Sequence, residues 1–276
     1  MNQGDPGRAL VARMQSLLFV PGSRPDRFAG ALASGADAIC IDLEDAVPPE
    51  GKEEARRAAI GALGDPRLAI RCNGLTTEHG RRDIEALAAA TVRPPLLFLP
   101  KVESAAELAP ASALGLPLAP LIETPRGLRA AHEIAAAPGV AAMMFGGGDL
   151  SAELGVELAW EPLAVARGQF ILACAEAGVP AIDVPFIRLE DEAGLEEETR
   201  RAKALGFAVK AAIHPRQIEA IHRVFRPTDE EIAEARAADE VFRAAGGAAV
   251  RFRGRMLEEP VMRRYRRILE QGKAYA

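Results

Sequence analysis

Two apolar stretches of this 276-residue chain stop at a carboxylate. The segment "LIETPRG", residues 121–127, reaches Glu123, and "MMFGGGDLSAELG", residues 143–155, reaches Asp149. Polar residues end other apolar runs in the same way, namely Ser23, Arg24, Asp42, Glu44, Asp45, Arg71, Asn73, Lys101, Glu103, Asp183 and His214. Several acidic groups in one low-dielectric site repel one another unless a cation is present. Oxygen ligands with no thiolate or paired histidines favour Mg²⁺ over Zn²⁺.

The elements that would position these residues alternate regularly along the chain. Short apolar runs, typical of buried strands, are separated by longer segments of helical period. The runs cover residues 16–20, 38–43, 68–72, 96–100, 118–123, 140–145, 181–184 and 209–213. Their apolarity is continuous, which indicates strands covered on both faces, as in a parallel sheet. Eight strand–helix repeats predict a (β/α)8 TIM barrel, whose active site lies at the carboxyl ends of the strands.

An open doubly wound sheet is the alternative fold, although no "GxGxxG" follows the first run, as a dinucleotide site would require. We expect residues 1–15 to be a loose tail, residues 16–227 to form the barrel and residues 228–276 to form a C-terminal helical extension. Within the extension, the sequence predicts one helix that begins at Thr228 or Asp229 and a second helix that begins with Pro260. We expect it to fold over the barrel mouth of its own or a neighbouring chain.

Composition and charge argue against several classes of protein. The chain is 49% hydrophobic and 26% charged, which is ordinary for a globular enzyme, and its net charge is −5. Nucleic acids and membrane surfaces are polyanionic, so neither is an expected partner. Cys40, Cys72 and Cys174 lack the spacing of a zinc cluster or a disulfide framework. A reducing cytoplasm is therefore the expected location. No run approaches the ~20 apolar residues of a membrane span.

Eight motifs carry a resemblance to a known family. They are "LLFVPGSRPDRF", "CIDLEDAV", "IRCNG", "FLPKVES", "LIETPRG", "FGGGDL", "KAAIHPRQI" and "RGRMLEEPV". In this order and spacing, from about residue 16 to 270, the chain resembles the citrate lyase beta-subunit-like (HpcH/HpaI aldolase) family, which includes malyl-CoA and citramalyl-CoA lyases. The resemblance implies a (β/α)8 barrel that assembles as a homotrimer or hexamer. It also implies that a carbon–carbon bond is cleaved or formed beside a coenzyme A thioester.

The same resemblance implies roles for individual residues of the barrel. Glu123 and Asp149 match the family's ligands to Mg²⁺, with Mn²⁺ as an alternative, and Arg71 matches the arginine that holds the substrate. Glu123 also contacts substrate in relatives. The backbone amides of Gly147, Gly148 and Asp149 would receive the substrate carboxylate, as glycine-rich turns at a helix start can do. Many members carry a glutamate at the position of Gly148, so substrate size or orientation could differ here.

The resemblance also implies a catalytic base and a coenzyme A site. Glu258 in "MLEEP" falls where relatives carry an aspartate, delivered by a neighbouring subunit, that acts as the base. The expected coenzyme A residues are Ser23, Arg24 and Arg27 of the first loop, together with Glu44 and Asp45 as groups on the coenzyme A side or behind the metal.

Structural roles remain as alternatives for several of these residues. Asp42, Glu44 and Asp45 could cap the helix that follows them, Arg71 could be a salt-bridge partner, and His214 is expected to fix a turn. Three functions other than a lyase also stay open. They are an acyl-CoA thioesterase using the same metal, an aldolase of free pyruvate adducts, and a non-catalytic citrate lyase-type subunit.

Overall fold

The computed structural model describes residues 6–274. The chain divides into two compact units, one ending at His222 and the other starting at Arg223. The sequence placed this boundary at 227/228, whereas the division lies inside helix α11, Gln217–Phe225. Within residues 6–274, no helix combines the length and apolarity that crossing a bilayer requires.

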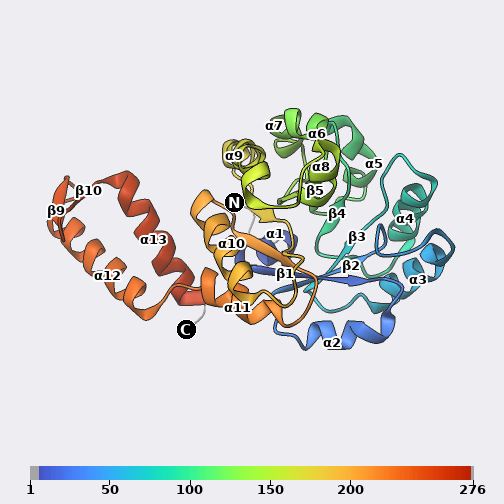
Figure 1. Cartoon of the computed structure of the whole chain (residues 1–276), viewed down its shortest axis with the longest axis horizontal. Helices are drawn as coiled ribbons and strands as arrows, with labels where there is room; N and C mark the ends of the chain where they lie inside the picture. Colours follow the sequence, from blue (N-terminus) through green and yellow to red (C-terminus); the bar gives the residue numbers. More distant parts are fainter. Residues whose placement is uncertain (1–5, 275–276) are drawn as a thin grey trace. The chain divides into compact units, whose positions relative to one another are not determined.

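Eight parallel strands close into a barrel in sequence order, which confirms the predicted fold (Figure 1). Each strand pairs with the next, and β1 pairs with β8 to complete the ring. The strands are short because each crosses the barrel wall once, and nearly every residue in them is buried. They are β1 Ser16–Pro21, β2 Ala38–Asp42, β3 Leu68–Arg71, β4 Leu97–Leu99, β5 Leu118–Ile122, β6 Met143–Phe145, β7 Ala181–Asp183 and β8 Val209–Ala212.

Helical segments follow the strands, and several begin at a side-chain cap. Thr77, Thr124 and Asp191 each accept a hydrogen bond from the backbone N–H three residues later. The α-helices are α2 Phe28–Leu32, α3 Lys52–Ala62, α4 Glu78–Ala89, α5 Ala109–Ser112, α6 Pro125–Arg129, α7 Ala131–Ala135, α8 Gly147–Leu154, α9 Trp160–Ala177, α10 Glu192–Leu205 and α11. Short 3-10 turns η1 Pro25–Arg27, η2 Pro49–Gly51 and η3 Ala105–Leu108 precede α2, α3 and α5.

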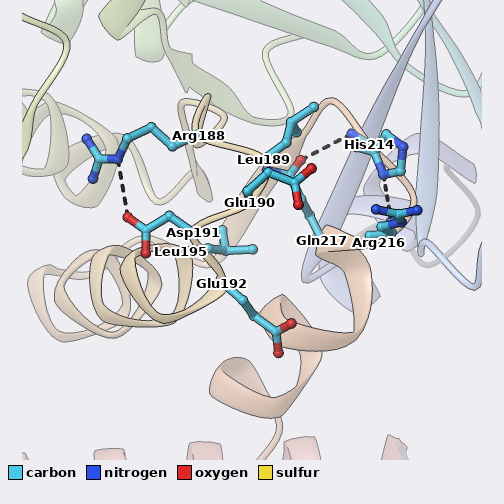
Figure 2. Close-up of a pocket in the computed structure, with 9 residues that line it drawn as sticks. All are labelled: Arg188, Leu189, Glu190, Asp191, Glu192, Leu195, His214, Arg216 and Gln217. Atoms are coloured by element: carbon cyan, nitrogen blue, oxygen red, sulfur yellow. Dashed lines mark hydrogen bonds and ion pairs between the residues drawn. The ribbon is translucent and has the colours of Figure 1, made fainter.

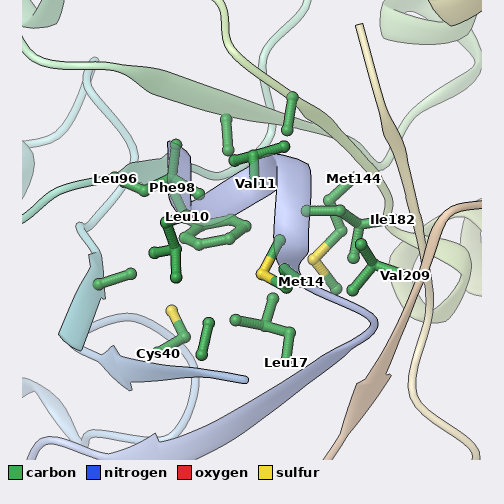
Figure 3. Close-up of a cluster of buried hydrophobic side chains, with 14 of the residues drawn as sticks. Leu10, Val11, Met14, Leu17, Cys40, Leu96, Phe98, Met144, Ile182 and Val209 are labelled. Carbon is green, nitrogen blue, oxygen red and sulfur yellow. The ribbon is translucent and has the colours of Figure 1, made fainter. Parts of the chain in front are cut away.

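Residues 6–13, which the sequence placed in a loose tail, are instead helical. Pro6–Arg13 form helix α1, whose Leu10 and Val11, together with Met14 just after the helix, pack against the inward-facing side chains of the strands (Figure 3). A Cβ on Gly7 would lie 2.1 Å from the carbonyl oxygen of Pro95, so the helix approaches the start of β4 closely. The helix therefore covers the amino-terminal end of the barrel and buries apolar surface there. Residues 1–5 of the predicted tail lie outside the described residues.

The second unit is a pair of helices joined by a β-hairpin. α12 is Asp229–Ala244, and the strands β9 Val250–Phe252 and β10 Arg255–Leu257 lead into α13, Glu259–Ala274. The predicted start of α12 is confirmed, because Thr228 and Glu231 form a capping box. Phe242, Leu257, Met262 and Tyr265 belong to a small core of this unit. The sequence had predicted the two helices but not the hairpin.

Candidate active site at the carboxyl ends of the strands

Five neighbouring strands bring polar residues to one end of the barrel. Asp42 ends β2 and Arg71 ends β3. Lys101 follows β4, Glu123 follows β5, and Asp149 lies in the first turn of α8 just after β6. The strands are parallel and adjacent, so their carboxyl ends share one rim. Ion pairs and hydrogen bonds connect these residues across the rim.

Arg71 and Asp42 form a paired unit. The Arg71 Nε and Nη2 groups donate to the two carboxylate oxygens of Asp42, each at 2.7 Å. Burial, the largest single influence, would raise the pKa of Asp42, but the hydrogen bonds and charge of Arg71 together with the backbone N–H groups of Glu44 and Ala46 lower that pKa. Arg71 Nη1 lies 3.1 Å from Glu44 Oε2, and the guanidinium covers the ring of Phe19. The salt-bridge alternative for Arg71 is therefore confirmed.

The capping alternative is wrong for Asp42, because the helical segments that follow have Pro48 and Gly51 as their N-caps and no side-chain cap. Asp42 accepts hydrogen bonds from the backbone N–H groups of Glu44 and Ala46, so it does fix the turn after β2. Lys52 donates to the carbonyl oxygens of Leu43 and Glu44 instead of pairing with a carboxylate of this turn. The carboxylate of Asp42 thus holds the loop and orients Arg71 at the same time.

Lys101 is the centre of a carboxylate cluster. Its Nζ lies 2.9 Å from Glu44 Oε1, 3.4 Å from Asp45 Oδ1 and 3.1 Å from Asp149 Oδ2. Burial, the largest single influence, would lower the pKa of Lys101, but the contacts with Glu44 and Asp149 and the charge of Asp45 together raise that pKa. The sequence placed Lys101 on the rim without giving it a role. Its position after the fourth apolar run was the signal, but the three contacts depend on the tertiary fold.

Glu123 is a buried carboxyl group with a strongly perturbed pKa. Its exposed fraction is 5%, and it accepts a hydrogen bond of 2.7 Å from the backbone N–H of Lys101. Burial, reinforced by the charge of Glu44, raises the pKa of Glu123 to about 8. Gly146 packs directly against it, because a Cβ there would lie 2.0 Å from Glu123 Cγ. Glycine is thus required beside this side chain.

Glu123 and Asp149 fit a hard divalent cation. Both contact Lys101, one through its backbone N–H and the other through its ammonium, and the charge of Asp149 is close enough to help raise the pKa of Glu123. The charge of a buried carboxylate such as Glu123 is costly, and a bound cation would compensate it. Within residues 6–274 no group of three or more His, Cys, Asp or Glu residues could hold a metal. Mg²⁺ is usually held by one or two carboxylates with water and substrate, so two ligands suffice.

Helix α8 begins just before Asp149, with Gly147 and Gly148 in its first turn. Gly146 is the N-cap and makes no side-chain cap, and α8 begins at Gly147. The first N–H groups of a helix have no partner within it, and they favour an anion. A Cβ on Gly148 would meet no heavy atom within 4 Å, so the space beside it is open. This geometry supports the predicted role of Gly147, Gly148 and Asp149 as carboxylate receptors.

A hollow of about 350 Å³ adjoins the carboxylate cluster on the side of β3 and β4. Glu44 and Lys101 belong to its lining, together with Asn73, Thr76 and Val102. Asn73 is held there by Asp83, which accepts hydrogen bonds of 2.7 Å from its backbone and side-chain nitrogens. The hollow therefore offers space for the part of a substrate that extends away from Lys101.

The predicted coenzyme A residues of the first loop are exposed. Arg24 pairs with Asp26 at 2.7 Å, and Ser23 donates a long hydrogen bond of 3.5 Å to the carbonyl oxygen of Ala46. Arg27 is exposed at the end of η1. By contrast, Glu44 and Asp45 belong to the Lys101 cluster. The coenzyme A assignment of these five residues stays a prediction.

A second hollow, of about 200 Å³, lies between the loops after β7 and β8 (Figure 2). His214 shapes the turn after β8. Its ring Nδ1 accepts a hydrogen bond of 3.1 Å from the backbone N–H of Arg216, and its backbone N–H donates to Oε1 of Gln217. This confirms the predicted turn role of His214. Arg188 and Asp191 on the opposite side pair with each other at 3.2 Å.

Asp183 does not face the barrel mouth, contrary to the sequence prediction. Ile182 before it belongs to the inward-facing cluster, and neighbouring residues of a strand point to opposite faces. The Asp183 carboxylate lies outside the barrel wall, 2.6 Å from Lys210 Nζ and 3.1 Å from Arg167 Nε of α9. These groups form a buried ion-pair network and not a part of the rim.

Glu258 belongs to the second unit, where it is exposed at the start of α13. Its carbonyl oxygen accepts a hydrogen bond of 2.9 Å from the N–H of Met262. Its predicted role as the catalytic base, and the predicted position of the extension over a barrel mouth, stay predictions.

Comparison with known proteins gives the family. Residues 15–215 match the family described as HpcH/HpaI aldolase/citrate lyase, and residues 167–276 match one described as a C–C bond lyase of the TIM-barrel fold. An L-malyl-CoA/beta-methylmalyl-CoA lyase from Rhodobacter capsulatus is 33% identical over 307 residues, covering 96% of each chain. A (3S)-malyl-CoA thioesterase from Cereibacter sphaeroides is 37% identical over 249 residues, covering 86% of this chain and 87% of that one.

A solved structure extends the similarity. The crystal structure of CitE from Mycobacterium tuberculosis, in complex with magnesium, acetoacetate and coenzyme A, is 37% identical with a TM-score of 0.84. The match covers 95% of this chain and 99% of that one. Sequence family, barrel topology and structural similarity agree, and the chain therefore belongs to the HpcH/HpaI aldolase/citrate lyase family.

Proposed function

We propose that this protein is a Mg²⁺-dependent carbon–carbon lyase. Its substrate would be a 3-hydroxyacyl-CoA such as malyl-CoA or citramalyl-CoA, cleaved to, or formed from, a 2-keto acid and an acyl-CoA. One observation carries the proposal: Glu123 and Asp149, from neighbouring strands, both reach Lys101 beside the Arg71–Asp42 pair. The malyl-CoA lyase relative and the magnesium and coenzyme A named with the CitE structure agree with it.

Glu123 and Asp149 are the residues that would hold the metal. When bound, Mg²⁺ supplies Lewis-acid polarisation of the oxygens of the keto-acid half. The backbone N–H groups at Gly147 and Gly148 would receive the carboxylate of that half and fix its orientation. The thioester half would extend into the hollow beside Asn73.

Arg71 would stabilise the oxygen on which charge develops. Asp42 fixes the guanidinium through two hydrogen bonds, so no reorganisation is needed during the reaction. In the cleavage direction a base takes the proton of the 3-hydroxyl group, and the carbon–carbon bond electrons pass to the thioester enolate. The enolate then takes up a proton to give the acyl-CoA. Removing one such fixed donor costs about 3 kcal/mol of transition-state stabilisation by analogy with oxyanion holes.

Glu258 would be the base, supplied by a neighbouring copy of the chain in a homo-oligomer. Glutamate is a competent proton acceptor when it is brought within hydrogen-bond reach of the hydroxyl group. Glu258 is exposed on its own unit, so its carboxylate is available to another surface.

A thioesterase is the second candidate, favoured by the 37% identity to the (3S)-malyl-CoA thioesterase. The same metal-held acid could serve hydrolysis of the thioester. The two activities differ in their products, because hydrolysis releases free coenzyme A while cleavage releases acetyl-CoA or propionyl-CoA.

The test is an activity screen over malyl-CoA, citramalyl-CoA and β-methylmalyl-CoA, with Mg²⁺ and with EDTA. We expect acyl-CoA and keto acid with Mg²⁺ and no turnover with EDTA. Asp149→Ala should abolish the Mg²⁺-dependent turnover, and His214→Ala, which alters a turn outside the carboxylate cluster, should spare most of it. Full turnover by Asp149→Ala would exclude the metal assignment, and free coenzyme A as the product would establish the thioesterase. Inactivity with every substrate would favour a non-catalytic subunit.

A further inference from the structure

Lys101 contacts both residues that would hold the metal. Its backbone N–H donates to Glu123 Oε2 at 2.7 Å, and its ammonium lies 3.1 Å from Asp149 Oδ2. The same ammonium lies 2.9 Å from Glu44 Oε1 and 3.4 Å from Asp45 Oδ1. The ammonium of Lys101 therefore joins three carboxylates that would otherwise repel one another, while its backbone fixes a fourth. Arg71 Nη1 also lies 3.1 Å from Glu44 and 3.9 Å from Asp45, so these two carboxylates have a second cation beside them.

The backbone of Lys101 is held in an uncommon conformation. Its φ is +53°, and within residues 6–274 the only other non-glycine residue with positive φ is Arg253. Such a conformation is costly for a residue with a side chain, and it persists where surrounding contacts impose it. Here the hydrogen bond to Glu123 and the ion pairs of the ammonium come from the same residue. The strained backbone of Lys101 thus accompanies the placement of its N–H group and its ammonium against the residues that would hold the metal.

An ammonium and a divalent cation would compete for Asp149. Both are cations, and each needs the same carboxylate within contact distance, so their mutual repulsion exceeds thermal energy even in a water-like medium. Glu44 and Asp45 offer the ammonium a second position that leaves Asp149 free. The Lys101 side chain is 43% exposed, so solvent does not prevent this movement.

We propose that Lys101 is a built-in counter-cation of the carboxylate cluster. Its ammonium leaves Asp149 when Mg²⁺ binds and stays paired with Glu44 and Asp45. This competition for Asp149 weakens the binding of free Mg²⁺. This inference rests on the metal assignment of the proposed function. Its consequence is that the metal ion binds tightly only when the cluster gains further negative charge, as from the carboxylate of a keto acid.

The test is calorimetric titration of MgCl₂ into the metal-stripped full-length protein without substrate. Lys101→Met and Lys101→Gln remove the charge, and both should bind Mg²⁺ about tenfold more tightly than the native protein, which corresponds to about 1.4 kcal/mol. Lys101→Arg keeps the charge and should bind within about threefold of the native protein. Lys203→Met on α10 removes an equal charge outside the cluster and should leave the affinity unchanged.

Further variants separate this inference from the metal assignment itself. Asp149→Asn should lose Mg²⁺ binding, and native-like affinity in this variant would overturn the metal assignment. If Asp149→Asn loses binding but both neutral Lys101 variants bind Mg²⁺ no more tightly than the native protein, only the counter-cation role of Lys101 is overturned. Thermal unfolding gives a second readout: in EDTA, Lys101→Met should melt below the native protein, and added Mg²⁺ should raise its Tm by more than it raises the native Tm. An equal Mg²⁺-induced rise in both proteins would also overturn the inference.

Discussion

Replacing Gly146 with alanine tests how Glu123 is held. A Cβ at this position would lie 2.0 Å from Glu123 Cγ and 2.8 Å from its carboxyl carbon, distances that no packed structure tolerates. The φ of Gly146 is −91°, which alanine adopts freely, so the backbone itself does not oppose the change. The whole effect of Gly146→Ala is therefore displacement of the Glu123 side chain.

The size of the expected loss in stability follows from the burial of Glu123. Its exposed fraction is 5%, so the side chain cannot swing into solvent without leaving the N–H of Lys101 unpaired. Overpacking a buried site costs about 1 to 3 kcal/mol, and an unsatisfied buried polar group costs a further ~1 to 3 kcal/mol. We expect Gly146→Ala to lower the free energy of unfolding by about 2 to 6 kcal/mol, the sum of the two costs. Misplacement of the metal ligand should also lower Mg²⁺-dependent turnover by about 100-fold.

Urea denaturation in EDTA measures the first effect, and turnover as a function of Mg²⁺ concentration measures the second. Gly148→Ala and Gly168→Ala are matched controls for stability, because an added Cβ at either glycine meets nothing within 4 Å. In these helical positions alanine should stabilise the protein by up to ~1 kcal/mol. A urea midpoint for Gly146→Ala equal to that of the native protein, with unchanged Mg²⁺ dependence, would refute the placement of Glu123 against Gly146.

Three further predictions concern the barrel and its buried charges. The pKa of Glu123 is about 8 in the folded protein and ordinarily 4.5. At a pH between these two values, folding therefore takes up a proton at Glu123. Without divalent metal, the free energy of unfolding should consequently fall as pH rises from 5 to 8. Glu123→Gln should remove that part of the pH dependence in urea midpoints, and an unchanged pH profile would contradict the assignment. Lys210→Met leaves the buried Asp183 carboxylate with Arg167 as its remaining cation, and should cost about 3 to 5 kcal/mol in urea denaturation. Leu10→Ala should cost about 2 to 4 kcal/mol in the same assay, because Leu10 is 6% exposed beneath the barrel, and native-like stability would show that α1 does not contribute to the core.

The strands could be predicted from the sequence because barrel strands are buried on both faces. Each strand is a short continuous apolar run, and this pattern survives without any knowledge of the partner strands. Helix α1 could not be predicted in this way. Its eight residues include arginines and alanines, and Leu10 and Val11 become core residues only because the closed barrel presents an apolar end to cover. The hairpin β9–β10 was missed because its residues are largely exposed and lack an apolar run.

The candidate site, too, has features that the sequence predicts and features that depend on the fold. The sequence by itself determined that Arg71, Glu123 and Asp149 lie at strand ends, since the end of an apolar run is a local property. Only the tertiary structure decided which of these polar residues meet. Asp183 also ends a strand, yet strand alternation turns it outward to Lys210, 27 residues away. Lys101 reaches Glu44, 57 residues away, because closure of the barrel brings β2, β4 and β6 to one rim and a positive φ presents the ammonium there. Contacts between charges far apart in the chain depend on this closure, and no local pattern of residues encodes their distances.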